Sequence, residues 1–166
     1  AKVMPRVYNM PRPIAEVIPS DWSTKDATEF LHGTFPHYML GSNDKMTKEI
    51  TDAILLMNHA DTLGSIMKFD ISEETRNAIM IRTQEYEQLL ANGEIMPEAI
   101  QLLIPYMHII LALTDKYAAI CMNPPYMYSS NMPKTLLEYV NRNYDNGRTD
   151  LCASFMRVAQ RLLDDN

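Results

Sequence analysis

Apolar side chains recur at helical spacing in the first half of the chain. Between Met46 and Met57 they fall at intervals of one to four positions that keep them on one side of a helix, and charged residues fill many of the positions between them. Such a stripe indicates an amphipathic helix with one buried face. The pattern predicts a helical region from about Met46 that ends at Gly64. The stripe comprises Met46, Ile50, Ala53, Ile54 and Met57.

Two more helices are predicted in the middle of the chain. The first covers about residues 70–91, starts on acidic residues and ends at Asn92-Gly93. The second opens at Pro97, and we expect a kink or a break at Pro105 because proline has no backbone N–H to donate. Its buried stripe comprises Ile100, Leu103, Ile104, Met107 and Leu111.

The last part of the chain predicts a helix, a turn and a final helix. Pro133 suits the first position of a helix that runs to about Asn143, and residues 145–147 form a turn. Thr149 is expected to cap the last helix. The apolar stripe of that helix comprises Leu151, Phe155, Val158, Ala159 and Leu162.

Extended structure is expected in three places. The alternation over residues 65–69 predicts a short strand, and the apolar run over residues 117–122 predicts a buried one. Prolines in residues 1–21 exclude a helix and favour edge strands or an extended connection. A short helix capped by Ser23-Thr24 is expected to follow and to stop at Gly33.

The resulting fold class is α/β, helix-rich with few strands. We expect an extended entry over residues 1–21, a helical segment over 22–116 and a strand, loop and helices over 117–166. The 166 residues are 46% hydrophobic and carry a net charge of -6, which suits one globular domain but not a free-standing DNA-binding domain, since those are usually basic. No run is long enough to span a membrane and no secretory signal is visible, so a cytoplasmic location is expected.

Cysteines and histidines give no evidence of a metal site or a disulfide scaffold. Cys121 and Cys152 are far apart in the sequence and form no C-x-x-C pair, which favours buried thiols in a reducing compartment. The histidines lack the close spacing of zinc ligands, so no metal is expected. They are His32, His37, His59 and His108.

The candidate catalytic residues are Asn123, Pro124, Pro125 and Tyr126, which follow the predicted strand over 117–122. Asn-Pro-Pro-Tyr at the end of a strand suits an enzyme that methylates an amino nitrogen in a planar group, such as that of adenine. This amino group is a poor nucleophile because its lone pair is delocalised into the ring. The side-chain oxygen of Asn123 and the backbone carbonyl of Pro124 can accept its two N–H groups and stabilise the charge that develops during methylation. Rigid prolines hold both acceptors in place, and Tyr126 offers a face for a flipped base.

The residues around this motif resemble the adenine-specific DNA methyltransferases of phage-defence and restriction systems. The nearest likeness is to the PglX family of BREX systems and its type II relatives. That family commonly continues with Met-Gly-Ser-Lys and later with Ser/Thr-Asp-Leu-Phe, where this chain has residues 127–130 (Met-Tyr-Ser-Ser) and 149–152 (Thr-Asp-Leu-Cys). The resemblance is strong over about residues 117–160. It rests on Asn123, Pro124, Pro125, Tyr126, Met127, Ser129, Asn131, Met132, Leu137, Tyr139, Val140, Asn143, Tyr144, Asp150, Leu151 and Phe155.

The resemblance implies part of a Rossmann-like methyltransferase that uses S-adenosylmethionine. Such enzymes carry a glycine-rich loop for the donor, but the five glycines of this chain form no G-x-G. The donor site is therefore expected upstream of Ala1, and a target-recognition domain is expected beyond Asn166. The implied partners are double-stranded DNA with a flipped adenine and other subunits of a defence system, with no membrane. The chain alone is expected to be inactive.

Two other functions remain open on this reading. Enzymes that methylate glutamine side chains of proteins, or amino groups in RNA, use a similar four-residue motif for the same chemical reason. A non-catalytic interaction module derived from a methyltransferase would fit the acidic charge and the missing donor loop. Arginines after the motif either contact phosphates or, as the favoured interpretation, form a solvated helix face; they are Arg142, Arg148, Arg157 and Arg161.

Overall fold

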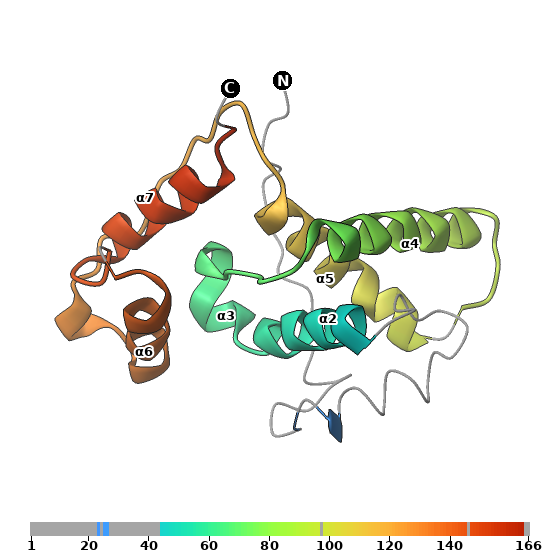
Figure 1. Cartoon of the computed structure of the whole chain (residues 1–166), viewed down its shortest axis with the longest axis horizontal. Helices are drawn as coiled ribbons and strands as arrows, with labels where there is room; N and C mark the ends of the chain where they lie inside the picture. The colour runs from blue at the N-terminus through green and yellow to red at the C-terminus, as the bar shows by residue number, and fades with distance from the viewer. Residues whose placement is uncertain (1–22, 24, 27–43, 97, 146, 165–166) are drawn as a thin grey trace. The chain divides into compact units, whose positions relative to one another are not determined.

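The computed structural model describes residues 23, 25–26, 44–96, 98–145 and 147–164. These residues are mostly helical, with short 3-10 helices at Gly64–Ile66 and Ser129–Asn131. They divide into two compact units. We call the described residues of 44–58 and 69–114 the α4–α5 unit, and those of 59–68 and 115–164 the α6–α7 unit. The α-helices, seen in Figure 1, are α2 (Asp44–Met57), α3 (Ala60–Leu63), α4 (Glu73–Ala91), α5 (Glu98–Thr114), α6 (Lys134–Asn143) and α7 (Leu151–Leu162).

The α4–α5 unit is a three-helix arrangement in which α2, α4 and α5 pack against one another. The predicted stripe of α2 is buried throughout, and Met57 is among its least exposed residues. Four of the five stripe positions of α5 are also buried, while Leu111 is only partly covered. Helical periodicity therefore identified the core face of both helices, because burial of an apolar face is what stabilises a helix of this length.

The ends of α4 follow from local signals. Its N-cap is Ser72, whose hydroxyl accepts a hydrogen bond from the Thr75 backbone N–H, and acidic residues occupy its first turn. Gly93, with φ of 76°, follows its C-cap in the left-handed conformation that glycine adopts without strain. The helix predicted over 70–91 is confirmed, with its start at Glu73.

The break considered at Pro105 is wrong, because α5 is one continuous helix from Glu98 to Thr114. Pro105 lies on the exposed side of α5. The neighbouring Ile104 and Tyr106 are buried. Packing of the flanking side chains thus maintains the helix although one backbone hydrogen bond is lost.

A carboxylate on α2 joins the start of α4. Glu49 accepts hydrogen bonds from the backbone N–H of Ser72 (3.0 Å), from the Ser72 hydroxyl (2.8 Å) and from the Thr75 hydroxyl. Partial burial raises the pKa of Glu49, but these hydrogen bonds and the charge of Lys45 outweigh burial and lower it from 4.5 to about 2. The ionised carboxylate therefore stabilises the α4–α5 unit.

We expect Glu49→Gln to lower the free energy of unfolding by about 2 kcal/mol at pH 7. Because the pKa is depressed in the folded state, the stabilisation is fully present above the unfolded value of 4.5 and is lost as the pH falls toward 2. The difference between the two proteins should therefore shrink over that window. Urea unfolding at several pH values measures it. The control is Glu85→Gln, which removes an exposed ion pair with Arg82; an equal effect of both changes would contradict the role of Glu49.

The predicted strands over 65–69 and 117–122 are not strands in the described part of the chain. Residues 64–66 form a 3-10 helix, and Tyr117 makes only an isolated parallel bridge with Leu163. Tyr117 donates its N–H to the Leu162 carbonyl (2.8 Å) and accepts from the Asp164 N–H (3.0 Å). Apolar runs alone do not make a strand, because a strand also needs a neighbouring strand to pair with.

Burial in residues 117–122 also differs from the expectation. Tyr117 is buried, but Ala118, Ala119 and Cys121 are exposed. Cys121 and the partly exposed Cys152 are free thiols. The expectation of two buried thiols is therefore wrong.

Several predicted boundaries shift in the structure. Helix α2 ends at Met57, before the short α3, so the helical region does not reach Gly64 as one helix. Pro133 is the N-cap of α6 and not its first helical residue. The cap of α7 is Asp150, whose carboxylate accepts the Cys152 N–H, in place of Thr149. Short polar side chains at adjacent positions compete for capping, and only the backbone path decides between them.

The predictions for the beginning of the chain lie mostly outside the described residues. These are the extended entry over 1–21 and the body of the helix expected after Ser23. Ser23 itself accepts a hydrogen bond from the Asp26 N–H (3.2 Å), and the Asp26 carboxylate accepts from the Ser23 N–H (3.1 Å), a reciprocal pair that suits a helix start. Among the described residues, no helix has the length and apolar character needed to cross a membrane.

Candidate active site

The Asn-Pro-Pro-Tyr motif lies in the α6–α7 unit, in an extended segment without regular secondary structure between α5 and the 3-10 helix at 129–131 (Figure 1). Asn123 and Pro125 are exposed, Pro124 is partly covered, and Tyr126 is 84% exposed. An apolar ring with this exposure contributes little to the core. The motif is therefore available to an incoming group and is not part of the packing of its own unit.

The C-terminal side of the motif is tied to the start of α7. The Met127 carbonyl accepts the Leu151 N–H (2.9 Å), and the Ser129 N–H donates to the Thr149 carbonyl (3.1 Å). These bonds flank an isolated antiparallel bridge between Tyr128 and Asp150. In a bridge of this kind the opposed side chains stand close together. The tether fixes the backbone immediately after Tyr126.

Tyr128 stands where the resemblance described above leads to the expectation of glycine, and its side chain is 69% exposed. Its backbone is extended, with φ of -70° and ψ of 151°. The replacement for glycine is accommodated because this conformation is open to any residue. A second exposed aromatic ring thus lies two positions after Tyr126.

The turn between α6 and α7 depends on a close approach of two backbone segments. The Ser154 hydroxyl of α7 donates to the Gly147 carbonyl (2.8 Å), and the Gly147 N–H donates to the Tyr144 carbonyl (2.8 Å). Gly147 is buried, and a Cβ atom there would lie 2.9 Å from the backbone N and Cα of Ser154. Glycine is needed here for lack of space.

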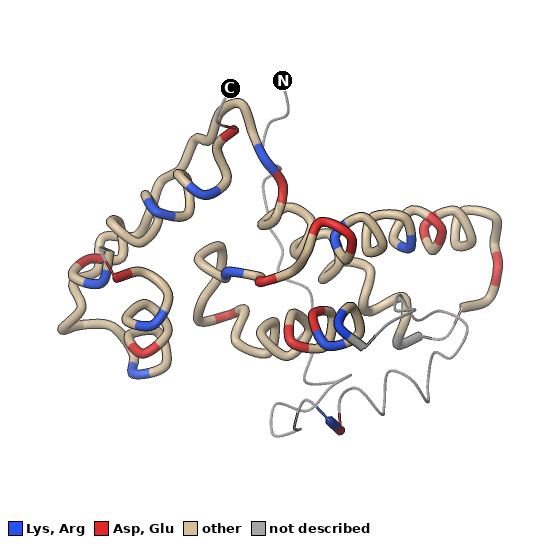
Figure 2. Tube along the Cα trace, in the orientation of Figure 1, with Lys and Arg blue, Asp and Glu red and all other residues tan. Residues whose placement is uncertain are grey.

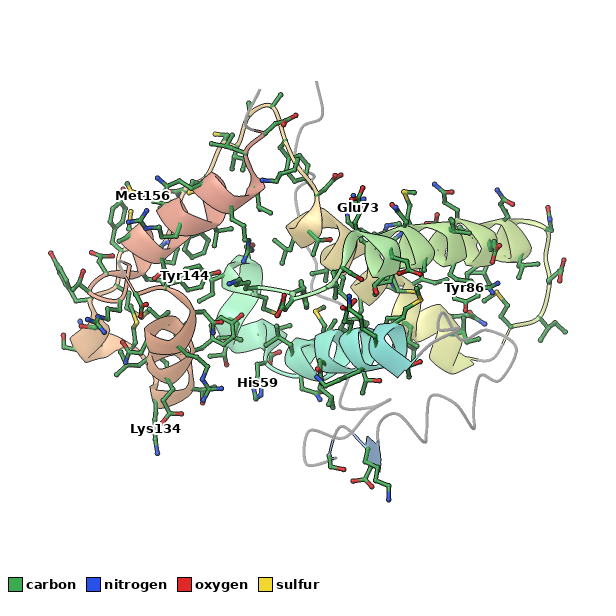
Figure 3. The ribbon with its side chains drawn as sticks, in the orientation of Figure 1. His59, Glu73, Tyr86, Lys134, Tyr144 and Met156 are labelled. Carbon is green, nitrogen blue, oxygen red and sulfur yellow. The ribbon has the colours of Figure 1, made fainter. Side chains whose placement is uncertain are left out.

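Three side chains hold the segment from Ile66 to Lys68 against α6 and α7. The Tyr139 hydroxyl accepts the Lys68 N–H (2.7 Å), and the Tyr144 hydroxyl donates to the Ile66 carbonyl. Arg161 of α7 donates through Nη2 to the Met67 carbonyl (3.0 Å) and through Nη1 to the Tyr144 hydroxyl (3.4 Å). We call Tyr139, Tyr144 and Arg161 the clamp; Tyr144 is labelled in Figure 3.

The clamp tyrosines stay neutral over the physiological range. Burial raises the pKa of Tyr139, against the opposing effects of the Lys68 hydrogen bond and the Arg161 charge. Burial also raises the pKa of Tyr144, although the charge of Arg161 acts in the opposite direction. Both hydroxyls therefore keep the proton that allows Tyr144 to donate.

We expect Tyr144→Phe to loosen the clamp, because the Ile66 carbonyl loses its donor. The cost should be about 1–2 kcal/mol for one buried acceptor left without its partner. Deuterium uptake at residues 66–68 should rise. Tyr128→Phe is the matched control, since the side chain of Tyr128 is exposed, and it should leave the uptake unchanged. Equal uptake in both variants would contradict the role of the Tyr144 hydroxyl.

A pocket of about 400 Å³ opens beside the clamp. Basic residues line it from two segments, with Lys68 at the end of the clamped segment and Arg157 and Arg161 on α7. Figure 2 marks Lys and Arg positions in blue along the trace of α7. Asp145 is the acidic residue of its lining. The remaining lining residues are Asn143 and Tyr144.

The expected exposure is found for three of the four arginines, although Arg148 lies in the turn between α6 and α7 and not on a helix. Arg142, Arg148 and Arg157 are exposed, whereas Arg161 is partly buried and bonded to the clamped segment. Sequence reasoning did not single out Lys68 or the clamp tyrosines for a site. They come together from segments 71 to 94 positions apart, and no local pattern signals such a contact. No group of three potential metal ligands occurs among the described residues.

Comparison with known proteins gives one family match. The sequence profile of the family described as Eco57I restriction-modification methylase matches residues 40–166. This range includes both described units and the Asn-Pro-Pro-Tyr motif. The match therefore covers well over half of the chain.

Two curated relatives carry related names. The chain is 32% identical over 120 residues to "Adenine-specific methyltransferase BrxX" of Escherichia coli O9:H4 (strain HS), which is 72% of this chain and 10% of that protein. It is 44% identical over 55 residues to "Adenine-specific methyltransferase PglX" of Lacticaseibacillus casei (strain Zhang), which is 33% of this chain and 5% of that protein. The chain thus spans a tenth or less of the length of either relative.

Proposed function

The chain belongs to the Eco57I restriction-modification methylase family, and on that premise we propose that it is part of an enzyme that methylates adenine in DNA, with S-adenosylmethionine as methyl donor. The names of both relatives support this activity, since each is called an adenine-specific methyltransferase. In this proposal the enzyme works in the cytoplasm within a restriction or phage-defence system, alongside other subunits of that system.

The observation that carries the proposal is the exposed Asn-Pro-Pro-Tyr segment with its fixed C-terminal side. The Asn123 side-chain oxygen and the Pro124 carbonyl accept the two N–H groups of the adenine amino group. Two accepted hydrogen bonds draw the nitrogen lone pair out of the ring and stabilise the positive charge of the transition state. The hydrogen bond from Leu151 to Met127 (2.9 Å) restrains the backbone next to the motif.

Tyr126 supplies the stacking surface for the base. A flipped adenine loses its stacking partners in the duplex, at a cost of a few kcal/mol. Stacking on an aromatic side chain returns about 1–3 kcal/mol. With an exposed fraction of 84%, the Tyr126 ring has its surface available for this contact.

The proposal assigns to this chain only the binding of the target adenine, and not the binding of the methyl donor. A donor site of this enzyme class needs a glycine-rich turn between a strand and a helix. The described glycines occur singly, with Gly64 at the start of a 3-10 helix and Gly93 and Gly147 in turns, and the sequence contains no G-x-G. The residues present therefore do not fit the donor, and other parts of the longer protein are proposed to bind it.

Methyl transfer from labelled S-adenosylmethionine to unmethylated DNA by the full-length protein tests the proposal. The expected result is label in the exocyclic amino group of adenine after digestion to nucleosides. Label in a protein or in RNA, with none in DNA, would replace the proposed substrate. Absence of label from all three would favour a non-catalytic interaction module.

A further inference from the structure

Arg161 combines partial burial with an unbalanced charge. Its guanidinium donates to the Met67 carbonyl and the Tyr144 hydroxyl, and it makes no salt bridge among the described residues. Its Nε atom is buried and has no hydrogen-bond partner there. A charge withdrawn from water is costly unless an opposite charge compensates it. The partly buried guanidinium of Arg161 is therefore suited to contact an oxyanion.

Two further cations face the same space. Lys68 and Arg157 line the pocket of about 400 Å³ together with Arg161. Arg157 is held by the Gln160 side chain (2.7 Å). The Lys68 backbone is fixed by the Tyr139 hydroxyl (2.7 Å). Against these three cations the lining contains one carboxylate, that of the exposed Asp145.

The cationic pocket contrasts with the acidic character of the chain as a whole, which has a net charge of -6. Lys116, also in the α6–α7 unit, is a cation whose hydrogen bonds go to backbone carbonyls. Its ammonium donates to the carbonyls of Arg161 (2.9 Å) and Leu163 (3.2 Å) and thereby closes the end of α7. Among the described residues, the three cations of the pocket have only single carbonyl contacts at their charged ends, from Arg161 to the Met67 backbone and from Arg157 to the Gln160 side chain. Their arrangement suits an external oxyanion.

We propose that Lys68, Arg157 and Arg161 bind a phosphate group of the DNA backbone. The inference rests on the proposed function, because it takes DNA as the substrate. Arginine provides planar, directed donors for phosphate oxygens, and lysine adds a mobile point charge. The bound phosphate also balances the partly buried charge of Arg161.

The span along α7 between the loop after the motif and the pocket limits how far the contacted phosphate can lie from the target adenine. Asp150, which pairs with the loop after the motif, and Arg157 are seven positions apart on this helix. At 1.5 Å per residue the separation is about 10 Å along the helix axis. With 3.4 Å per nucleotide along each strand of the duplex, that distance corresponds to about three nucleotides. The contacted phosphate should thus lie within a few nucleotides of the target adenine.

Salt dependence of DNA binding tests the site in the full-length protein. Removing one phosphate contact should reduce the slope of log K against log salt by about 1. We expect this reduction for Arg157→Ala and for Lys68→Ala, with Kd raised about threefold to tenfold at moderate salt. The matched controls are Arg142→Ala and Lys134→Ala, which remove exposed cations of α6 that do not line the pocket; Lys134 is labelled in Figure 3. The control slopes should not change.

A scan with neutral methylphosphonates locates the contact once the methylated adenine is mapped. One substitution within a few nucleotides of that adenine should weaken binding by the unchanged protein and have little further effect on Arg157→Ala. If no position shows this coupling, the inference is overturned. Equal salt slopes for the pocket variants and the control variants would overturn it as well.

If the unchanged protein methylates DNA while the pocket variants bind normally, the pocket assignment fails and the proposed function stands. If it methylates no DNA, the proposed function itself fails.

Inorganic phosphate distinguishes a DNA phosphate from a free anion. At constant ionic strength, millimolar phosphate should not raise the melting temperature of the unchanged protein more than that of Arg157→Ala. A phosphate-dependent rise confined to the unchanged protein, together with unaltered salt slopes, would overturn the assignment to DNA and identify a site for a small free anion.

Discussion

Replacement of Asn123 by alanine in the full-length protein is expected to lower the rate of methyl transfer to DNA about a hundredfold to a thousandfold. One preorganised hydrogen-bond partner of a developing charge contributes a factor of this size. The side-chain oxygen that accepts one N–H of the amino group is lost, while the Pro124 carbonyl remains. Because Asn123 is exposed, the change should leave folding nearly unaffected. Single-turnover transfer from labelled S-adenosylmethionine measures the rate.

Two controls separate this role from a structural one. Asn123→Asp keeps an acceptor oxygen and should retain more of the rate than Asn123→Ala. Asn131→Ala removes an exposed asparagine from the same loop region and should retain nearly all of it. Donor binding and thermal stability should be the same in all three variants. An undiminished rate in Asn123→Ala would remove Asn123 from the catalytic assignment.

Gly147→Ala should be the most destabilising small substitution in the α6–α7 unit. The added Cβ would lie 2.9 Å from the Cα and N atoms of Ser154 and 3.1 Å from the carbonyl carbon of Ala153. These are backbone atoms of α7, so no side-chain rotation relieves the clash. The helix would have to shift, and such overpacking costs about 1–3 kcal/mol. We expect a value near the upper end, because the Ser154 hydrogen bond to the Gly147 carbonyl would be strained as well.

Urea unfolding and deuterium uptake together measure this effect. The Gly147→Ala variant should show reduced unfolding free energy and faster exchange in α6 and α7, with α4 and α5 unchanged. Gly93→Ala is the comparison, because Gly93 has φ of 76° and open space around it. That change introduces backbone strain without a clash, and its effect should stay at the end of α4. If Gly147→Ala unfolds like the unchanged chain, the close approach does not limit this position.

Local rules on the sequence determined most of the helices. The stripes at Met46–Met57 and Ile100–Met107 are buried as predicted, since helical spacing places apolar residues on one face whatever lies opposite. Asn92-Gly93 marks the end of α4, because few residues adopt positive φ. The motif and its flanks also predicted the methylase family, and the profile match over residues 40–166 confirms it. The catalytic roles of the motif residues stay predictions.

Strand pairing and the side-chain hydrogen bonds between distant segments were decided by tertiary structure alone. The apolar run over 117–122 contains the signal of a strand, but in the described part of the chain it makes only isolated bridges, because pairing depends on a neighbour that the run itself does not encode. Arg161 looks like any basic residue of a surface helix, yet it is anchored to a carbonyl 94 positions earlier. Periodicity and capping act over a few residues, so the sequence determined them directly. The clamp and the pocket require segments from distant parts of the chain to meet, and only the folded chain shows that they do.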